Sequence, residues 1–201
     1  MLTVGLTGGL ATGKSFVSAA LAGLGCRVIR ADVLGHEVLE PGAEGYEPAI
    51  AEFGREILNP DGTIDRHRLA SIVFPAPDRL AKLTSLVHPA VIRREEELIR
   101  EAAAADPQVI VVVEAAILVE TGSYKRFDRV VVTVCDRETQ IERALGRGGL
   151  TRQEVEERLS RQLPADKLRR VANYVIDTSG TEENTQAQVL ELHRVLRSLR
   201  Q

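Results

Sequence analysis

Apolar residues in this chain fall either in short unbroken runs or in longer segments with helical spacing. The run at residues 109–113 is entirely β-branched, which is typical of a strand buried on both faces of a parallel sheet. Four further runs predict strands, at residues 2–7, 26–29, 130–134 and 174–176. Helical spacing lies between them. The alternation predicts an α/β fold with three layers and a five-stranded parallel sheet.

Residues 41–106 interrupt this alternation, because the pattern there is helical and contains no convincing strand. Helical spacing covers residues 44–53, 66–74, 77–87 and 89–105, and Asn59–Gly62 has the composition of a turn. Pro89 predicts the start of a separate helix, since proline is tolerated in a first turn. We therefore expect a helical insertion at 41–106 in a core formed by residues 1–40, 107–145 and 164–201.

A second interruption follows the fourth strand. The helical segment 138–145 ends in a cluster of glycines, and Thr151 with Glu154 then forms a capping box for a helix that is expected to reach residue 163. We interpret residues 146–163 as a short lid. Segments 14–24, 32–39 and 183–199 complete the predicted helices of a single domain.

Residues 8–15 read GGLATGKS and match the pattern G-x-x-x-x-G-K-[ST] between a predicted strand and a predicted helix. This is a P-loop, whose amides and helix N-terminus bind the phosphates of a nucleoside triphosphate. Lys14 is expected to reach the β- and γ-phosphates, and the Ser15 hydroxyl to bind Mg²⁺. The nucleotide-binding residues that we predict are Gly8, Gly9, Ala11, Thr12, Gly13, Lys14, Ser15 and Phe16.

Two carboxylates end predicted strands, where the ligands of open α/β sheets bind. Asp32 follows the second strand and is the candidate base that takes a proton from an attacking hydroxyl. The alternative is that Asp32 only caps the next helix. Glu114 ends the third strand and could hold a magnesium water. The alternative for Glu114 is a carboxylate satisfied by the backbone.

Charge is segregated along the chain, although its net value is only −3. Residues 137–170 contain nine Lys and Arg against six Asp and Glu. An arginine-rich helix after a glycine hinge predicts a lid that closes over the transferring phosphate, with Arg143 and Arg147 as its catalytic candidates. The alternative is a solvated helix with pairs such as Glu154–Arg158.

The composition excludes other classes. With a pI near 5.9 and no Trp, the chain is not expected to bind nucleic acid. The longest apolar run is too short to cross a membrane. Cys26 and Cys135 both lie among apolar residues, which predicts reduced thiols and a cytoplasmic location.

Taken together, these motifs resemble the dephospho-coenzyme A kinase family almost from end to end. The P-loop, the segment Ile29–Asp32, His88–Pro89, Glu114–Glu120, the segment Gln140–Arg143 and the final Val175–Asp177 follow the family pattern in order. The resemblance implies ATP-dependent phosphorylation of the ribose 3′-hydroxyl of dephospho-CoA, giving CoA and ADP.

The resemblance also implies roles for individual residues. Asp32 would be the base, and Arg66 and His88 would lie on the acceptor side, although a structural role for His88 at a helix start is an equal alternative. Phe16 stands where the family usually has Thr, Arg30 replaces an acid, and Gly148 follows Arg147 where an acid is common. These departures put a second hydroxyl, a metal role for position 30 and a tight lid tip in doubt.

Two other functions stay open on the sequence. One is another small-molecule P-loop kinase, with a nucleoside monophosphate or a shikimate-like acceptor. The other is an adaptor that binds ATP without phosphoryl transfer, which the presence of Asp32 disfavours. We expect small molecules as the only ligands and a monomer or a weak homo-oligomer.

Overall fold

The computed structural model describes residues 1–200, which form two compact units. The core unit consists of Met1–Arg30 and the chain from Glu101 to its end, and the inserted unit is Ala31–Arg100. The inserted unit begins earlier in the chain than the predicted insertion at 41–106. The helix that directly follows the second strand, Ala31–Glu37, is therefore part of the inserted unit and not of the core.

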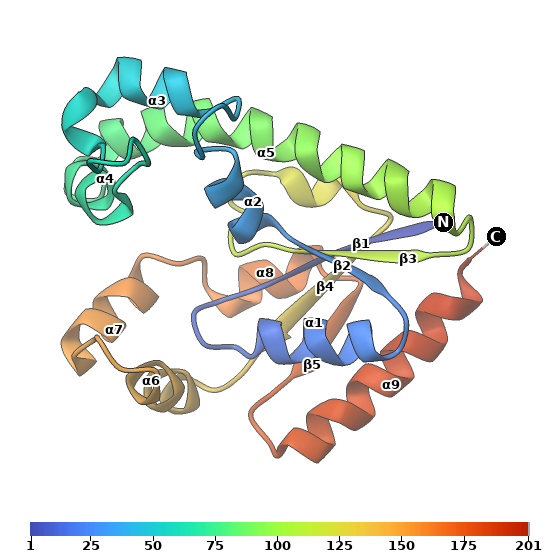
Figure 1. Cartoon of the computed structure of the whole chain (residues 1–201). Coiled ribbons are helices and arrows are strands. Elements are labelled where there is room, and N and C mark those ends of the chain that lie inside the picture. The colour runs from blue at the N-terminus through green and yellow to red at the C-terminus, as the bar shows by residue number, and fades with distance from the viewer. Residues whose placement is uncertain (201) are drawn as a thin grey trace. The chain divides into compact units, whose positions relative to one another are not determined.

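The core unit contains one sheet of five parallel strands, as predicted (Figure 1). The strand order is β2-β3-β1-β4-β5. Each observed strand extends one residue beyond its predicted run, and the second and third strands also begin one residue later than predicted. The strands are β1 (Leu2–Gly8), β2 (Arg27–Arg30), β3 (Ile110–Glu114), β4 (Arg129–Val134) and β5 (Tyr174–Asp177).

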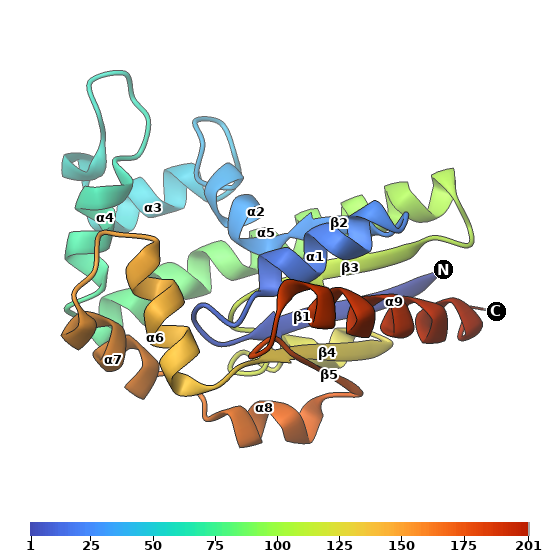
Figure 2. The same cartoon turned by 90° about the horizontal axis from the view of Figure 1, so that it is seen from below.

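Helices cover the two faces of this sheet, and the alternation of side chains along β4 shows how. Val131 faces the core cluster beneath α1 (Lys14–Gly23) and α9 (Glu182–Ser198). Val130 and Val132 face the opposite way, against Leu168 of α8 (Ala165–Val171). In Figure 2, α1 and α9 lie side by side on one face and α8 lies across the sheet from them. The predicted three-layer arrangement is therefore confirmed.

Two helices follow β4, and only the second of them lies within the lid predicted at residues 146–163; we call the wider stretch 137–163 the lid segment. Helix α6 (Arg137–Gly146) and helix α7 (Arg152–Ser160) are separated by the predicted glycine turn. The capping box of Thr151 and Glu154 is present. Helix α7 ends earlier than predicted, and α8 is a separate helix that the sequence pattern did not predict. Pro164 precedes α8 and cannot donate a backbone hydrogen bond, which explains the break.

The inserted unit is helical, as predicted, with one isolated antiparallel bridge between Leu58 and Ile64. Its core gathers apolar side chains around Phe53, Ile57 and Leu69. The residues that lie between the helices include a short 3₁₀ turn, η1. The elements are α2 (Ala31–Glu37), α3 (Tyr46–Phe53), η1 (Arg55–Ile57), α4 (Arg66–Val73) and the greater part of α5 (Pro77–Ala105).

The predicted break at Pro89 is wrong, because α5 is one continuous helix with Pro89 inside it. A proline in a helix removes one backbone hydrogen bond and crowds the preceding turn, at a cost of roughly 3 kcal/mol. Helical spacing on both sides is long enough to outweigh that local loss. In the turn before Pro89, the hydroxyls of Thr84 and Ser85 donate to the carbonyls of Leu80 and Lys82.

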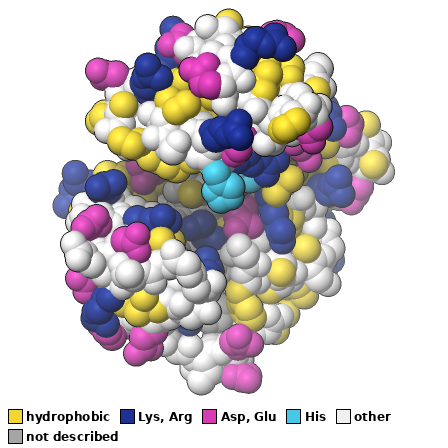
Figure 3. Space-filling model, turned by 60° about the vertical axis from the view of Figure 1, so that its left-hand side comes forward, with side chains coloured by type: hydrophobic (Ala, Val, Ile, Leu, Met, Phe, Trp, Pro, Cys, Tyr) yellow, Lys and Arg dark blue, Asp and Glu magenta, His cyan; other side chains and the backbone are white. Residues whose placement is uncertain are grey.

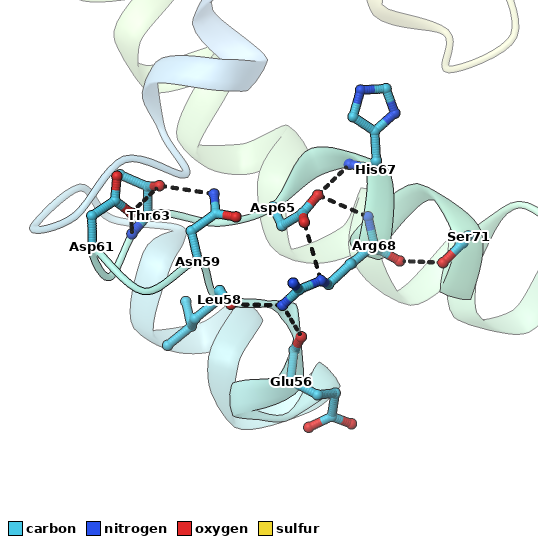
Figure 4. Close-up of polar contacts among 9 residues, drawn as sticks. All are labelled: Glu56, Leu58, Asn59, Asp61, Thr63, Asp65, His67, Arg68 and Ser71. Atoms are coloured by element: carbon cyan, nitrogen blue, oxygen red, sulfur yellow. Dashed lines mark hydrogen bonds and ion pairs between the residues drawn. The ribbon is translucent and has the colours of Figure 1, made fainter.

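Figure 4 shows how the inserted unit fixes the start of α4. The Asp65 carboxylate accepts from the backbone N–H groups of His67 at 2.9 Å and Arg68 at 3.0 Å. The Arg68 guanidinium pairs with the same carboxylate at 3.1 Å and donates to the carbonyl of Leu58 at 3.0 Å. The loop before α4 is thus tied to the helix cap, while the His67 side chain points away from the network.

We predict that Asp65→Ala lowers the free energy of unfolding, because it removes an N-cap acceptor. Asp65→Asn keeps an acceptor oxygen and should lose less. Hydrogen bonds, foremost from the Arg68 backbone, lower the pKa of Asp65, so its charge stabilises the fold at neutral pH and this contribution disappears on acidification. Urea unfolding at neutral and acid pH measures both effects. An unchanged unfolding energy in Asp65→Ala would contradict the capping role.

Candidate active site

The P-loop connects the end of β1 to the start of α1, as the motif predicts. Thr133 of β4 lies directly behind it. A Cβ on Gly8 would come within 2.3 Å of the Thr133 hydroxyl oxygen, so only glycine fits there. Gly13 has φ +79° at the helix N-cap, a conformation that glycine adopts without strain. Both fixed glycines of the motif therefore have a steric cause.

The start of α1 is suited to an anion. No side chain caps this helix, and its first turn contains no acidic residue. Its backbone N–H groups and the positive end of its dipole are thus left for a ligand. The Lys14 ammonium lies over the loop and donates to the carbonyls of Gly8 at 2.7 Å and Gly9 at 2.9 Å. The predicted phosphate-binding groups therefore lie together at one turn of the chain.

Glu114 lies beside the P-loop serine. Its carboxylate accepts from the hydroxyl of Ser15 at 3.0 Å and from that of Ser18 at 2.6 Å, and only 8% of the residue is exposed. Hydroxyls satisfy the carboxylate, so the backbone alternative for Glu114 is wrong. The guanidinium of Arg30 lies 3.8 Å from the same carboxylate. Ser18 was missed, although it follows Ser15 by three residues and so shares its helix face.

Thr178, which follows β5, joins three parts of the core unit and was also missed. Its hydroxyl lies 3.1 Å from the carbonyl of Thr12 and 3.3 Å from that of Val134. The same hydroxyl accepts from Arg143 at 2.9 Å, and Arg143 also donates to the Thr178 carbonyl at 2.7 Å. Arg143 is thereby fixed against the P-loop. Arg147, at the end of α6, is exposed.

The remaining predicted residues belong to the inserted unit. Asp32 is exposed in the first turn of α2, inside the helix and not at the position before it. Arg66 begins α4 and pairs with Glu40 at 3.2 Å. His88 is half-buried in the middle of α5, so it does not stand at a helix start, as the structural alternative supposed. It lines a groove of about 490 Å³ along α5 together with Leu80 and Thr84.

The comparisons with known proteins decide the family. The family model described as dephospho-CoA kinase matches residues 2–184, which is most of the chain. The chain belongs to the dephospho-CoA kinase family.

Curated relatives agree with this assignment, and solved structures share the fold. The dephospho-CoA kinase of Geobacter metallireducens is 43% identical over 96% of this chain and 95% of that protein. The one from Thermobifida fusca is 41% identical over 96% and 94%. A crystal structure from Thermus thermophilus has a TM-score of 0.81 at 29% identity and covers 100% of this chain and 98% of that one. The fold also matches the dephospho-CoA kinase of Campylobacter jejuni, with a TM-score of 0.64 at 21% identity over 96% of each chain.

Within this dephospho-CoA kinase the lid segment is partly a charged surface. Arg152 pairs with Glu138 at 2.9 Å and with Glu156 at 3.1 Å, and all three side chains are exposed. Glu154 is occupied by the capping box. Figure 3 shows basic and acidic side chains interspersed over the surface that it draws. Exposed pairs of this kind stabilise little, so the arginines near the hinge remain the functional candidates.

The two cysteines take no part in this site as redox groups. Both are free thiols, Cys26 buried and Cys135 half-buried. Burial raises the pKa of Cys26 to about 11 and also raises that of Cys135. The thiolate is the nucleophilic form, so neither side chain is activated at neutral pH.

None of the helices between residues 1 and 200 combines the length with the apolar character that a membrane span requires.

We predict that Thr178→Val weakens both the fold and nucleotide binding, because it leaves the Arg143 guanidinium without one acceptor and the Thr12 carbonyl without a donor. The expected loss is about 1–3 kcal/mol of unfolding free energy. Thr178→Ser keeps the hydroxyl and is the matched control. Urea unfolding and ATP titration of both variants test this, and equal behaviour of the two would refute a role for the hydroxyl.

Proposed function

We propose that this dephospho-CoA kinase transfers the γ-phosphoryl group of ATP to the ribose 3′-hydroxyl of dephospho-CoA through the P-loop site of the core unit. The observation that carries the proposal is the arrangement of Lys14, Ser15 and Glu114 at one turn, in a chain that matches the family over residues 2–184. Products would be CoA and ADP. The residue roles below are parts of this proposal.

Lys14 would hold the β- and γ-phosphates. Its ammonium already lies over the loop, against carbonyl oxygens of Gly8 and Gly9. Phosphate oxygens are stronger acceptors than these carbonyls because they carry charge. The backbone N–H groups at the start of α1 would also donate hydrogen bonds to these phosphates. The ammonium and the helix dipole would both oppose the charge that develops during transfer.

The residues beside Lys14 fit Mg²⁺ bound with ATP. Ser15 and Glu114 supply oxygen atoms, which are the ligands that Mg²⁺ prefers. Among the residues that the structure describes, no group of three or more acidic, His or Cys side chains could hold a metal. The remaining ligands would therefore be phosphate oxygens and waters. When bound, the ion would neutralise phosphate charge, with Ser15 as its protein ligand and Glu114 orienting a water.

Asp32 would accept the proton of the ribose hydroxyl. The support is its place in the chain. The last residue of β2, Arg30, is paired with Glu114 in the sheet register, and Asp32 follows Arg30 by two residues. The carboxyl ends of parallel strands are where ligands of such sheets bind. Arg66 and His88 would contact the acceptor, and the groove beside His88 supports the role of His88. Arg143 and Arg147 would approach the transferring phosphate from the lid segment.

Two coarser expectations also remain proposals. We infer a cytoplasmic location, since both cysteines are free thiols and reduced thiols are typical of that compartment. We also infer a monomer or a weak homo-oligomer. The ligands would be ATP and dephospho-CoA, without nucleic acid.

The direct experiment measures ADP release with and without dephospho-CoA, in the presence of Mg²⁺. We expect release that depends on dephospho-CoA and on the metal, and phosphate on the 3′-oxygen of the product by ³¹P NMR. Release that depends only on shikimate or on a nucleoside monophosphate would replace the proposal by another small-molecule kinase. ATP binding without release for any acceptor would indicate a non-catalytic adaptor.

A second prediction isolates Asp32. Asp32→Asn keeps the size of the side chain but cannot accept the proton, so turnover should fall by about 10²- to 10⁴-fold while ATP affinity stays unchanged. Turnover is measured by coupled ADP release and affinity by calorimetry. Glu37→Gln, at the other end of the same helix, is the control for loss of one charge. Near-normal turnover of Asp32→Asn would remove this residue from the mechanism.

A further inference from the structure

Both backbone groups of Leu10, near the tip of the P-loop, are bound by side chains from the lid segment. The Leu10 N–H donates to the Oε1 atom of Gln162 at 2.8 Å. The Leu10 carbonyl accepts from the Nε2 atom of Gln140 at 2.9 Å. Gln140 lies on α6, and Gln162 follows the end of α7. The two glutamines therefore hold one residue of the P-loop from two elements of the lid segment.

The approach of the two glutamines is close. A Cβ on Gly9 would lie 3.1 Å from the amide nitrogen of Gln140 and 3.1 Å from the amide oxygen of Gln162. Both glutamine side chains are half-buried. The same two residues also line a cavity of about 150 Å³ together with Gly9 and Thr12 of the loop. Their hydrogen bonds fix the peptide planes on both sides of Leu10.

The next residue shows why those planes need fixing. Ala11 adopts a left-handed conformation with φ +57°, which costs an alanine free energy because its Cβ is crowded there. That Cβ is buried against Ile141 and Ala144 of α6 and Val155 of α7. The lid segment thus compensates the strained turn by packing, while the glutamines hold the residue before it.

We propose that Gln140 and Gln162 are positioning residues that keep the P-loop in its phosphate-binding shape and so couple the docking of the lid segment to ATP binding. The inference rests on the proposed ATP site but not on the identity of the acceptor. With the Leu10 N–H directed to Gln162 and the Thr12 N–H directed to the Gly9 carbonyl, the N–H groups at the start of α1 remain to face the phosphates. Loss of either glutamine releases the Leu10 peptides and leaves the cradle to be ordered by ATP itself.

The two hydrogen bonds have opposite polarity, which gives a matched pair of substitutions. Gln162 accepts a hydrogen bond, so Gln162→Glu keeps the interaction. Gln140 donates, so Gln140→Glu places a carboxylate oxygen against the Leu10 carbonyl. Both variants add one negative charge, and the two amide atoms that they replace lie equally far, at 3.1 Å, from the position of a Cβ on Gly9. Any general effect of charge on ATP binding is therefore shared, and the difference between them reports the hydrogen bonds.

The experiment measures ATP affinity by calorimetry and exchange of the Leu10 amide by NMR in the full chain. Gln140→Glu should bind ATP about tenfold more weakly than Gln162→Glu, as expected for a lost hydrogen bond with repulsion. Gln162→Leu should speed Leu10 exchange about tenfold, whereas Gln162→Glu preserves its protection. Steady-state kinetics of Gln140→Glu and Gln162→Leu should show a higher KM for ATP than the unsubstituted protein, with an unchanged KM for the acceptor.

Several outcomes would overturn the proposal. Equal ATP affinities of Gln140→Glu and Gln162→Glu would show that only charge matters there. Unchanged Leu10 exchange in Gln162→Leu would show that its side chain does not hold the loop. Thermal unfolding separates these effects from general instability, and Gln140→Leu gives a second reading if Gln140→Glu does not fold. Both binding readouts use ATP alone, so they stand even if dephospho-CoA is not the acceptor.

Discussion

A loop that turns its N–H groups toward an anion turns its carbonyl oxygens the other way, and each of these needs a donor. In this P-loop most of the donors are side chains, and the Thr12 N–H adds a backbone hydrogen bond to the Gly9 carbonyl at 3.4 Å. The Lys14 ammonium reaches the carbonyls of Gly8 and Gly9, and the Thr12 hydroxyl also donates to Gly9. A phosphate ligand competes only for Lys14. The other carbonyls need partners that persist whether or not nucleotide is bound.

Those partners come from distant parts of the chain. Gln140 donates to the carbonyl of Leu10, and the Thr178 hydroxyl lies within hydrogen-bond distance of that of Thr12. Thr133 adds a hydroxyl contact to Thr12 at 2.8 Å. Gln140 lies on α6, Thr133 lies within β4 and Thr178 follows β5. The loop can therefore take its shape only when β4, β5 and α6 are in place. The geometry of the phosphate site is thus a consequence of the completed core unit.

This dependence explains what the sequence could and could not predict. The P-loop was predictable because strand, glycines, lysine and helix are contiguous in the chain. The roles of Thr178, Gln140 and Gln162 were not predictable. They depend on which strand lies next to β1, and local sequence patterns do not determine the order of strands in a sheet. One signal was available: Thr133 interrupts a run of valines, and a buried hydroxyl requires a partner.

The elements show the same division. Periodicity predicted the strands and most helices, because each buries one face or both. It failed at Pro89, where a local preference was outweighed by helical spacing on both sides, and at α8, whose few residues carry only a weak pattern. The roles of Asp32, Arg66 and His88 depend on placement across two units, so they remain predictions.

Arg30 illustrates how a departure from a family pattern is accommodated. A second acid beside Glu114 would add charge to a carboxylate that is already nearly buried. The guanidinium at 3.8 Å reverses that effect. Since the Arg30 side chain is 56% exposed, the pair contributes little to stability. Its consequence is local: the Arg30–Glu114 pair carries no net charge, so a Mg²⁺ ion bound as proposed above would depend more on the phosphates of ATP than on protein ligands.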